Sequence, residues 1–495
     1  MKRRLLWLAG LFGLLALALP ALATAVEPPA EAPTVLSAEA VLASSRQHFP
    51  AILEAAAQRR EALGKAESAE GEFDLVFSAD GLGWATGFYD GRSATGGVQQ
   101  RLRSMGATVY SKYRVSGGEF PVYQDERFTN MGGQVKAGAV FSLMRDRVID
   151  AERFAVADAE LAVRKADLDL LLVKIGVQQR ALTAYWRWVA AGWQLRVYED
   201  LLALARDREA ALTTRVERGA LARIFLNENR QSLLRRQALV VAARRDFETA
   251  SNDLTFFYRT AQGEPRAVQQ AQLPPGSEAI ELKVDEAADA PEVEDVLRRR
   301  PEINLLRTVV QRAENRLTLS RDSLKPKLDF NVELASGLGG VGEGGVSRDS
   351  SDAVVGFQFS VPLQQRDARG RVAQAEAVLD AARLEQRQLE ERIEIQLRNI
   401  VLAVNYAQQL YALAVDERTE ATTLRQAEQR RFDSGASDFF LVNLREEDEA
   451  DVCVRYYQAA LNARIARATY DAATVSLRRL GLADDTGAGG AGSPE

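Results

Sequence analysis

The chain has one cysteine and one histidine among its 495 residues. Because Cys453 stands alone, no intrachain disulfide can form, and its place inside a helical pattern indicates a small apolar core residue. His48 alone excludes metal sites built from several histidines and leaves one candidate general base. No glycine-rich phosphate loop joins a strand to a helix, since GLGGVGEGG (337–345) lies between two expected strands. We therefore expect no enzyme activity, no cofactor and no metal.

Long apolar runs occur only at the N-terminus. The basic residues 2–4 precede an apolar run over 5–19, and small residues in A-x-A spacing follow it. This pattern predicts a secretory signal peptide over residues 1–25. No later run of eighteen apolar residues occurs, so no membrane-spanning helix is expected. Such an exported protein is periplasmic, secreted or a barrel.

The chain also has no large excess of positive or negative charge. The net charge is −6, with 69 acidic residues against 63 basic ones. Arginines alternate with acids along the expected helices, so no basic surface for a nucleic acid is indicated.

Internal repetition is present throughout the chain. Three pairs of stretches match in the same order: FPAI (49–52) with RPEI (300–303), GAVFSLMRDR (138–147) with GFQFSVPLQQRD (356–367), and RVERGALARIFLNENR (215–230) with RFDSGASDFFLVNLR (431–445). The matches predict a first structural repeat over 26–258, a linker or equatorial segment over 259–291 and a second repeat over 292–481. The closing residues 482–495 are typical of a disordered tail.

Within each repeat the hydrophobic period changes in the same sequence. Helical runs over 36–70 and 292–324 come first. Alternation of apolar and polar residues then predicts strands with one apolar face at 73–84, 134–144, 327–337 and 353–362. Strands of this length and pattern are typical of a transmembrane barrel, with lipid outside and water inside. A half-exposed soluble sheet is the alternative.

Very long helices follow the strands. Helical spacing continues over about 145–216 and again over 366–432, which corresponds to roughly 100 Å of helix each time. Each run meets a glycine, Gly219 or Gly435, and a shorter helix returns. Helices this long need coiled-coil packing along their length, so we expect two antiparallel hairpins with these glycines at their tips.

Two repeats of helix, strands, long helix, tip and returning helix resemble the TolC-like outer-membrane efflux protein family. The resemblance implies a mixed, mostly α fold in a homotrimer, with four strands per chain in one 12-stranded transmembrane β-barrel. Antiparallel helices would continue that barrel as a coiled-coil tunnel. It also implies an outer-membrane channel of a tripartite efflux or type I secretion system in a Gram-negative bacterium, extending into the periplasm. A trimer also agrees with physical reasoning, since four strands cannot close a wall in lipid.

The same resemblance implies partners. A periplasmic adaptor would engage the hairpin tips, which contain Arg215, Gly219, Arg431 and Gly435. An inner-membrane pump would supply energy, because the chain has no nucleotide-binding motif. An elongated periplasmic coiled-coil scaffold without a pore is the alternative function.

Two features depart from the family pattern. The stretch 85–133 is longer than its counterpart and contains ATVYSKYRV, which alternates as a strand does. Both flanking helices must leave the same side of the membrane, so this insert adds an even number of crossings or none. We favour an extracellular loop or hairpin that narrows the mouth, over two extra wall strands.

The second departure concerns the periplasmic gate. The positions where many members carry a ring of acids fall here on Leu441 and Leu444. Asp438 and Glu446 are the nearby acidic candidates, and Phe440 with Leu441 offers an apolar gate instead. A solvated acidic helix face is the simplest alternative, and the residues leave these options open.

Overall fold

The structure is a computed structural model that describes residues 35–275, 291–342 and 351–483. The predicted signal peptide lies outside the described residues. The same holds for residues 276–290 of the predicted linker and for residues 484–495 of the predicted tail.

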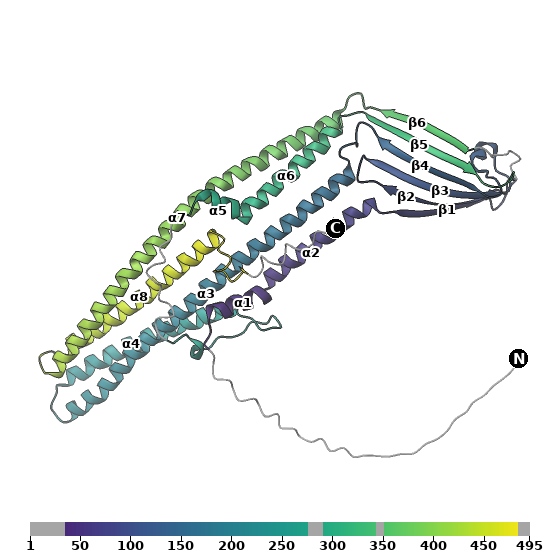
Figure 1. Ribbon diagram of the computed structural model, residues 1–495. Coiled ribbons are helices and arrows are strands. Elements are labelled where there is room, and N and C mark those ends of the chain that lie inside the picture. Colours follow the sequence, from purple (N-terminus) through teal and green to yellow (C-terminus); the bar gives the residue numbers. More distant parts are fainter. Residues whose placement is uncertain (1–34, 276–290, 343–350, 484–495) are drawn as a thin grey trace, which may run out of the picture.

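The molecule is elongated, with a sheet at one end and two helical hairpins reaching away from it (Figure 1). The first half contains α1 (Ala38–His48), α2 (Pro50–Glu70), β1 (Val76–Gly83), β2 (Arg92–Arg101), β3 (Ala107–Gly117), β4 (Gln134–Ser142), α3 (Ala151–Glu217) and α4 (Arg223–Thr255). The second half contains α5 (Val293–Arg299), α6 (Pro301–Asp322), β5 (Lys327–Gly337), β6 (Ser351–Ser360), α7 (Arg366–Asp433) and α8 (Phe439–Ala473). Short 3-10 turns lie at η1 (Gly71–Phe73), η2 (Val122–Arg127) and η3 (Gln270–Gln272).

Each half opens with a helix that a proline divides. Pro50 is the first residue of α2 and Pro301 is the first residue of α6. The residue before each proline is extended, as the proline ring requires, so α1 and α5 end there. The matched prolines of the sequence repeat therefore divide both opening helices at the same place.

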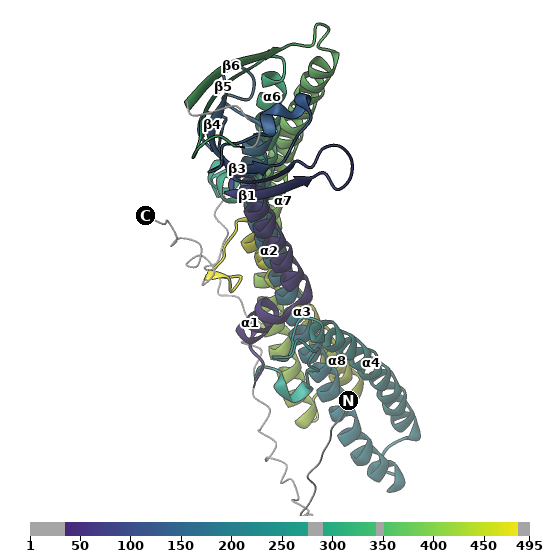
Figure 2. The same ribbon diagram turned by 90° about the vertical axis from the view of Figure 1, so that its right-hand side faces the viewer.

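The long helices α3 and α7 contain 67 and 68 residues. At about 1.5 Å per residue each reaches about 100 Å. The shorter α4 and α8 return beside them, and the long elements remain side by side in both views (Figures 1 and 2). Among the described residues, none of the helices combines the length and the apolar character needed to cross a membrane.

The sheet corrects the expected strand count. Six antiparallel strands follow one another in chain order, from β1 to β6, so the described residues contain six strands and not four. The two additional strands come from the insert, as β2 and β3. The preference for an extracellular loop or hairpin was therefore wrong for residues 92–117, which add two strands to the sheet. The expected even number of membrane crossings stays a prediction.

The sequence of β2 explains the error. RSATGGVQQR shows no strong alternation, because small residues occupy its centre. The strand forms because it pairs along its whole length with β1 on one side and with β3 on the other. Such tertiary pairing overrides weak strand propensity.

One face of the sheet is apolar across all six strands. The registers align Phe141 with Phe330 and Phe330 with Phe357, and Val98 pairs with Phe77 on the same side. The opposite face contains the charged side chains of the strand interiors: Asp80, Lys112, Arg114, Lys136, Asp329 and Glu333. The sheet is therefore amphipathic, as the alternation predicted.

The remainder of the insert, residues 118–133, crosses the polar face at the end remote from the helices. The Arg114 guanidinium donates to Thr95 Oγ1 at 3.2 Å and to the carbonyl of Glu126 at 3.2 Å. The Ser116 amide donates to Thr129 Oγ1 at 3.1 Å. This segment is the part of the insert that covers the polar face, as a loop that narrows the mouth would.

The turn between β2 and β3 rests on the helices. Arg101 forms an ion pair with Glu152 in the first turn of α3, and Arg103 lies 3.0 Å from Glu70 at the end of α2. The added hairpin is thus held at the helical end of the sheet by opposite charges.

The largest core lies midway along the helices, where segment 259–275 joins them. Trp188 is fully buried there and stacks on Phe247. Leu273 packs against Gly192, where a Cβ would lie 2.4 Å from Leu273 Cδ1, so a larger residue there would displace the leucine side chain. The linker therefore contributes side chains to the tryptophan-rich core.

Candidate functional site

The two hairpin tips share one backbone motif. Gly219 and Gly435 have φ values of +72° and +76°, the left-handed region that glycine adopts without strain. Their amides donate to Val216 and Phe432, and the next amides donate to the carbonyls of Arg215 and Arg431, at 2.8–3.0 Å. This is a Schellman motif, in which two amides satisfy the last carbonyls of the helix. The Arg-x-x-x-Gly spacing therefore lets the arginine carbonyl accept a hydrogen bond from the amide of the residue that follows glycine.

The arginine side chains at the tips point to different surroundings. Arg431 Nη1 lies 3.3 Å from the Glu428 carboxylate, and its Nη2 donates to the carbonyl of Ala436. Arg215 is exposed. Cationic side chains therefore lie at the end of both hairpins, where a partner protein could reach them.

A small apolar cluster joins the tips to each other. Leu212, Leu226 and Phe439 are buried together, and Val216, Leu221 and Phe432 pack around them. Because these residues come from α3, α4, α7, α8 and the first tip, the cluster fixes the ends of the two hairpins side by side.

Asp438, one of the candidate gate acids, caps a helix. Its carboxylate accepts a hydrogen bond from the Leu441 amide at 2.8 Å, three residues into the first turn of α8. An aspartate at this position satisfies an amide that has no partner within the helix. The role of Asp438 in the structure is therefore that of an N-cap for α8.

The apolar candidates lie on the exposed side of α8. Phe440 is 70% exposed and Leu444 is 47% exposed, and their i,i+4 spacing places them on one face. Leu441, between them in the sequence, is half-buried. The start of α8 thus presents an unusual exposed apolar face.

Glu446, the second candidate acid, lies on the other side of α8 and is 3% exposed. Its carboxylate accepts hydrogen bonds from Arg208 on α3 and from Arg236 on α4, at distances from 2.5 to 3.3 Å. Arg236 also donates to the carbonyl of Leu201 at 3.0 Å. The three charges form a buried clamp between the first hairpin and the second.

The neighbouring acids are also paired. Glu447 forms an ion pair with Arg235, Glu449 lies 2.5 Å from Arg425, and Asp448 lies 3.8 Å from Arg445. These carboxylates therefore meet arginines of the same chain.

Sequence reasoning missed Arg208 and Arg236. Both stand in ordinary arginine-rich helical stretches, and nothing in those stretches distinguishes them from exposed arginines. Their partner, a carboxylate more than 200 positions away, is brought beside them by the packing of α8 on α3 and α4. Only the tertiary structure reveals this pairing.

The polar face of the sheet has its own network. Tyr110 on β3 donates to Glu333 on β5 at 2.7 Å, across the intervening β4. Lys136 donates to the same carboxylate at 3.1 Å. The tyrosine passes over Gly138, where a Cβ would lie 2.6 Å from its ring. The network therefore ties an added strand to the second repeat.

The comparisons with known proteins find similarity in fold and none in sequence family. No protein-family model matches the sequence, and no curated protein matches it. Solved structures match over nearly the whole chain. The CmeC outer membrane channel of Campylobacter jejuni has a TM-score of 0.60 and 12% identity, over 90% of this chain and 89% of that chain.

Two further channels match equally broadly. The MtrE outer membrane channel of Neisseria gonorrhoeae, solved in its open state, has a TM-score of 0.60 and 14% identity, over 88% of each chain. The outer membrane protein VceC of Vibrio cholerae has a TM-score of 0.58 and 13% identity, over 88% of this chain and 95% of that chain. Similarity in structure at such identities shows a common fold, so the TolC-like fold expected from the sequence is confirmed.

Proposed function

We propose that the chain is one protomer of a homotrimeric outer-membrane channel-tunnel in a tripartite efflux or type I secretion system of a Gram-negative bacterium. It conducts substrates passively from a periplasmic adaptor and an inner-membrane pump to the exterior. The observation that carries the proposal is an amphipathic sheet whose two edge strands pair with no further strand in the described part of the chain. Its strands continue into two hairpins of about 100 Å.

The sheet supports a wall made by several copies. Within the described residues, β1 pairs only with β2 and β6 pairs only with β5, so one edge of each is open. In lipid, unpaired backbone groups are too costly to remain open. Pairing of β6 with β1 of the next protomer closes the wall, and three six-stranded sheets give 18 strands.

The outer face fits lipid. Phe77, Val355, Phe357 and Phe359 are each at least 60% exposed on the two edge strands. At the end of the sheet remote from the helices, the ring centroids of Trp84 and Tyr89 lie 5.9 Å apart in the turn between β1 and β2. Aromatic side chains are typical of the two boundaries of an apolar membrane band.

The helices offer a second surface for a neighbouring protomer. A stripe on α7 is more than half exposed although it is apolar: Leu384, Ile395, Leu402, Tyr406, Leu410 and Leu413. Its lower part borders a groove of about 520 Å³ between α7 and α8. On α2, at the opposite side of the protomer, Leu53 and Leu63 are also exposed. Neighbouring protomers that cover these surfaces would complete a helical tunnel.

The hairpin tips are the surface proposed for the adaptor. Gly219 and Gly435 form the ends furthest from the sheet, and Arg215 and Arg431 lie beside them. We place the periplasmic gate at the exposed apolar face of α8, at Phe440, Leu441 and Leu444. The acids Asp438 and Glu446 support that face, one as a helix cap and the other through the arginine clamp.

An elongated periplasmic scaffold without a pore is the alternative function. It accounts for the hairpins but leaves the apolar face of the sheet in water.

Cell fractionation and planar bilayers test the proposal. We expect the protein in the outer-membrane fraction, as trimers that persist in detergent, and stepwise ion currents after its insertion into bilayers. A monomer in the soluble periplasmic extract would favour the scaffold and would contradict the channel.

A further inference from the structure

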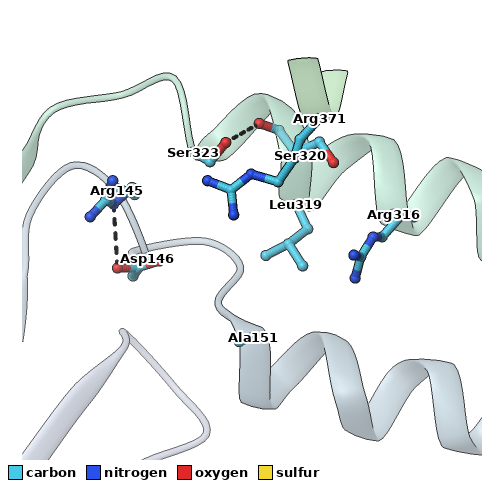
Figure 3. Close-up of a pocket in the computed structure, with 8 residues that line it drawn as sticks. All are labelled: Arg145, Asp146, Ala151, Arg316, Leu319, Ser320, Ser323 and Arg371. Atoms are coloured by element: carbon cyan, nitrogen blue, oxygen red, sulfur yellow. Dashed lines mark hydrogen bonds and ion pairs between the residues drawn. The ribbon is translucent and has the colours of Figure 1, made fainter. Parts of the chain in front are cut away.

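Three arginines surround one cavity where the sheet meets the helices. The cavity has a volume of about 380 Å³ and lies between the connection from β4 to α3, the end of α6 and the start of α7. Arg145, Arg316 and Arg371 come from these three elements (Figure 3). The remaining lining residues are Asp146, Ala151, Leu319, Ser320 and Ser323.

Positive charge exceeds negative charge in this cavity. Arg145 Nε is 3.8 Å from the Asp146 carboxylate, too far for a hydrogen bond. Arg371 pairs with Asp367, one turn earlier on α7, at 2.5 Å. The Arg316 guanidinium lies 5.4 Å from the centre of the Phe154 ring, and no carboxylate of the described residues lies within 4 Å of it. Asp322 accepts a hydrogen bond from the Asp146 amide and is neutralised by Lys325 at 2.6 Å. Two carboxylates, Asp146 and Asp367, therefore remain to balance three guanidinium groups.

The cavity continues in both directions. A cavity of about 370 Å³ shares Asp146 and Ala151 with it and includes Ser142 and Asp329 from the polar face of the sheet. A third, of about 130 Å³, shares Arg316 and Arg371 and extends along α6 and α7. The arginines therefore lie between the polar face of the sheet and the groove between α6 and α7.

The cavity beside the sheet has no such excess of positive charge. In the cavity beside the sheet, Arg101 pairs with Glu152, and Lys327 lies 3.4 Å from Asp329. Asp150 is held by Arg153 at 3.0 Å. Those charges neutralise one another, whereas Arg316 has no such partner among the described residues.

We propose that Arg145, Arg316 and Arg371 form a binding site for an oxyanion, such as the phosphate or carboxylate group of a solute in transit. The guanidinium group presents paired N–H donors that match the oxygens of such groups. Because each protomer supplies the three arginines, a trimer holds three equivalent sites at the level where the sheet joins the tunnel. The proposal rests on the proposed function and adds to it the charge of the favoured solutes.

Current block by inorganic phosphate tests the site. Trimers of the full chain are inserted into planar bilayers in chloride, and phosphate is added on one side. We expect phosphate to reduce the wild-type current. In the Arg316→Gln, Arg371→Gln double variant, the phosphate concentration for half block should rise about tenfold, since hydrogen bonds to charged groups are lost. The reversal potential in a salt gradient should shift towards cation preference.

Arg321→Gln is the matched control. Arg321 lies on the same helix and pairs with Glu376 at 2.9 Å, but it does not line the cavity. It removes one positive charge from the protomer, as Arg316→Gln alone does, and should leave phosphate block unchanged. Arg316→Lys keeps the charge but loses the paired donors, so its half-block concentration should fall between those of wild type and Arg316→Gln. Detergent-stable trimers on unheated gels confirm that each variant has assembled.

A parallel series with acetate separates the two kinds of oxyanion. Block by phosphate alone assigns the site to phosphate groups, and block by both extends it to carboxylates. A conducting wild-type channel that neither anion blocks would overturn the site and leave the channel function intact. Equal phosphate block in the double variant and in Arg321→Gln would also overturn it. Assembled protein that carries no current would overturn the proposed function and this site with it.

Discussion

Glu446 is the residue on which the contact between the two hairpins depends most. Its buried carboxylate neutralises Arg208 and Arg236, and Arg236 is itself 1% exposed. Glu446→Gln would leave two guanidinium groups facing a neutral amide. Loss of one partner from a buried ion pair costs about 3–5 kcal/mol. We expect faster amide hydrogen exchange in 201–212 and 439–450, measured by mass spectrometry on trimers in detergent.

Glu447 provides the matched control for that prediction. It is the next residue along α8, and its main partner, Arg235, has a side chain that is 62% exposed, whereas its distance to the buried Arg236 is 3.6 Å, longer than a hydrogen bond. Ion pairs with such exposure contribute at most about 1 kcal/mol. Glu447→Gln should therefore change exchange little, and equal changes in the two variants would contradict the buried clamp.

At the residue scale, glycines were easier to predict than charged partners. Gly138 and Gly356 match between the repeats, and each makes room for the side chain directly opposite, Tyr110 or Asn331. A requirement for space opposite a neighbouring side chain leaves glycine at the same repeat position. Arg236 has no such mark, because an arginine is common on any solvated helix and only packing makes this one buried.

At the scale of an element, β2 is the strand that most needs a direct test. If it is part of the wall, Val98 faces lipid beside Phe77, and Gln99 faces the polar side beside Tyr110. An arginine on the lipid face near the middle of a strand costs about 2–4 kcal/mol, whereas the inner face tolerates it. We expect Val98→Arg to lower the yield of outer-membrane trimers and Gln99→Arg to leave it near wild type.

The two adjacent substitutions differ only in the face that receives the charge. Equal trimer yields would indicate that residues 92–101 lie in water, as an extracellular loop does. A loss in Gln99→Arg alone would indicate a register shifted by one residue, because such a shift moves every side chain to the other face.

Elements with strong periodicity could be predicted from the sequence, and those defined by their neighbours could not. The strand predicted at 327–337 has the same bounds as β5, because apolar and polar residues alternate along it. The expected run 366–432 agrees with α7, which ends at Asp433. In β2 the small residues carry no period, so the strand becomes evident only beside β1 and β3.

At the scale of the whole molecule, the sheet and the helices each restrict the number of protomers in the assembly. Six strands per chain allow a 12-stranded wall from two copies or an 18-stranded wall from three. The tunnel must close with the same number of copies, through the apolar surfaces of α7 and α2. The number of protomers and the number of strands are therefore linked, and one measurement addresses both.

Electron cryomicroscopy of the protein in detergent provides that measurement. We expect particles with three-fold symmetry and 18 strands in the wall. Deletion of residues 92–117 removes β2 and β3, so that residues 84–91 and 118–133 join β1 to β4, and it preserves the direction of both flanking strands. Because barrel diameter grows about linearly with strand number, the 12-stranded wall of this variant should have about two-thirds of the original diameter. The helical tunnel serves as the internal control, since the deletion leaves α7 and α8 intact and the tunnel should keep its width. Two-fold particles would contradict the trimer, and an unchanged wall after the deletion would show that β2 and β3 lie outside it.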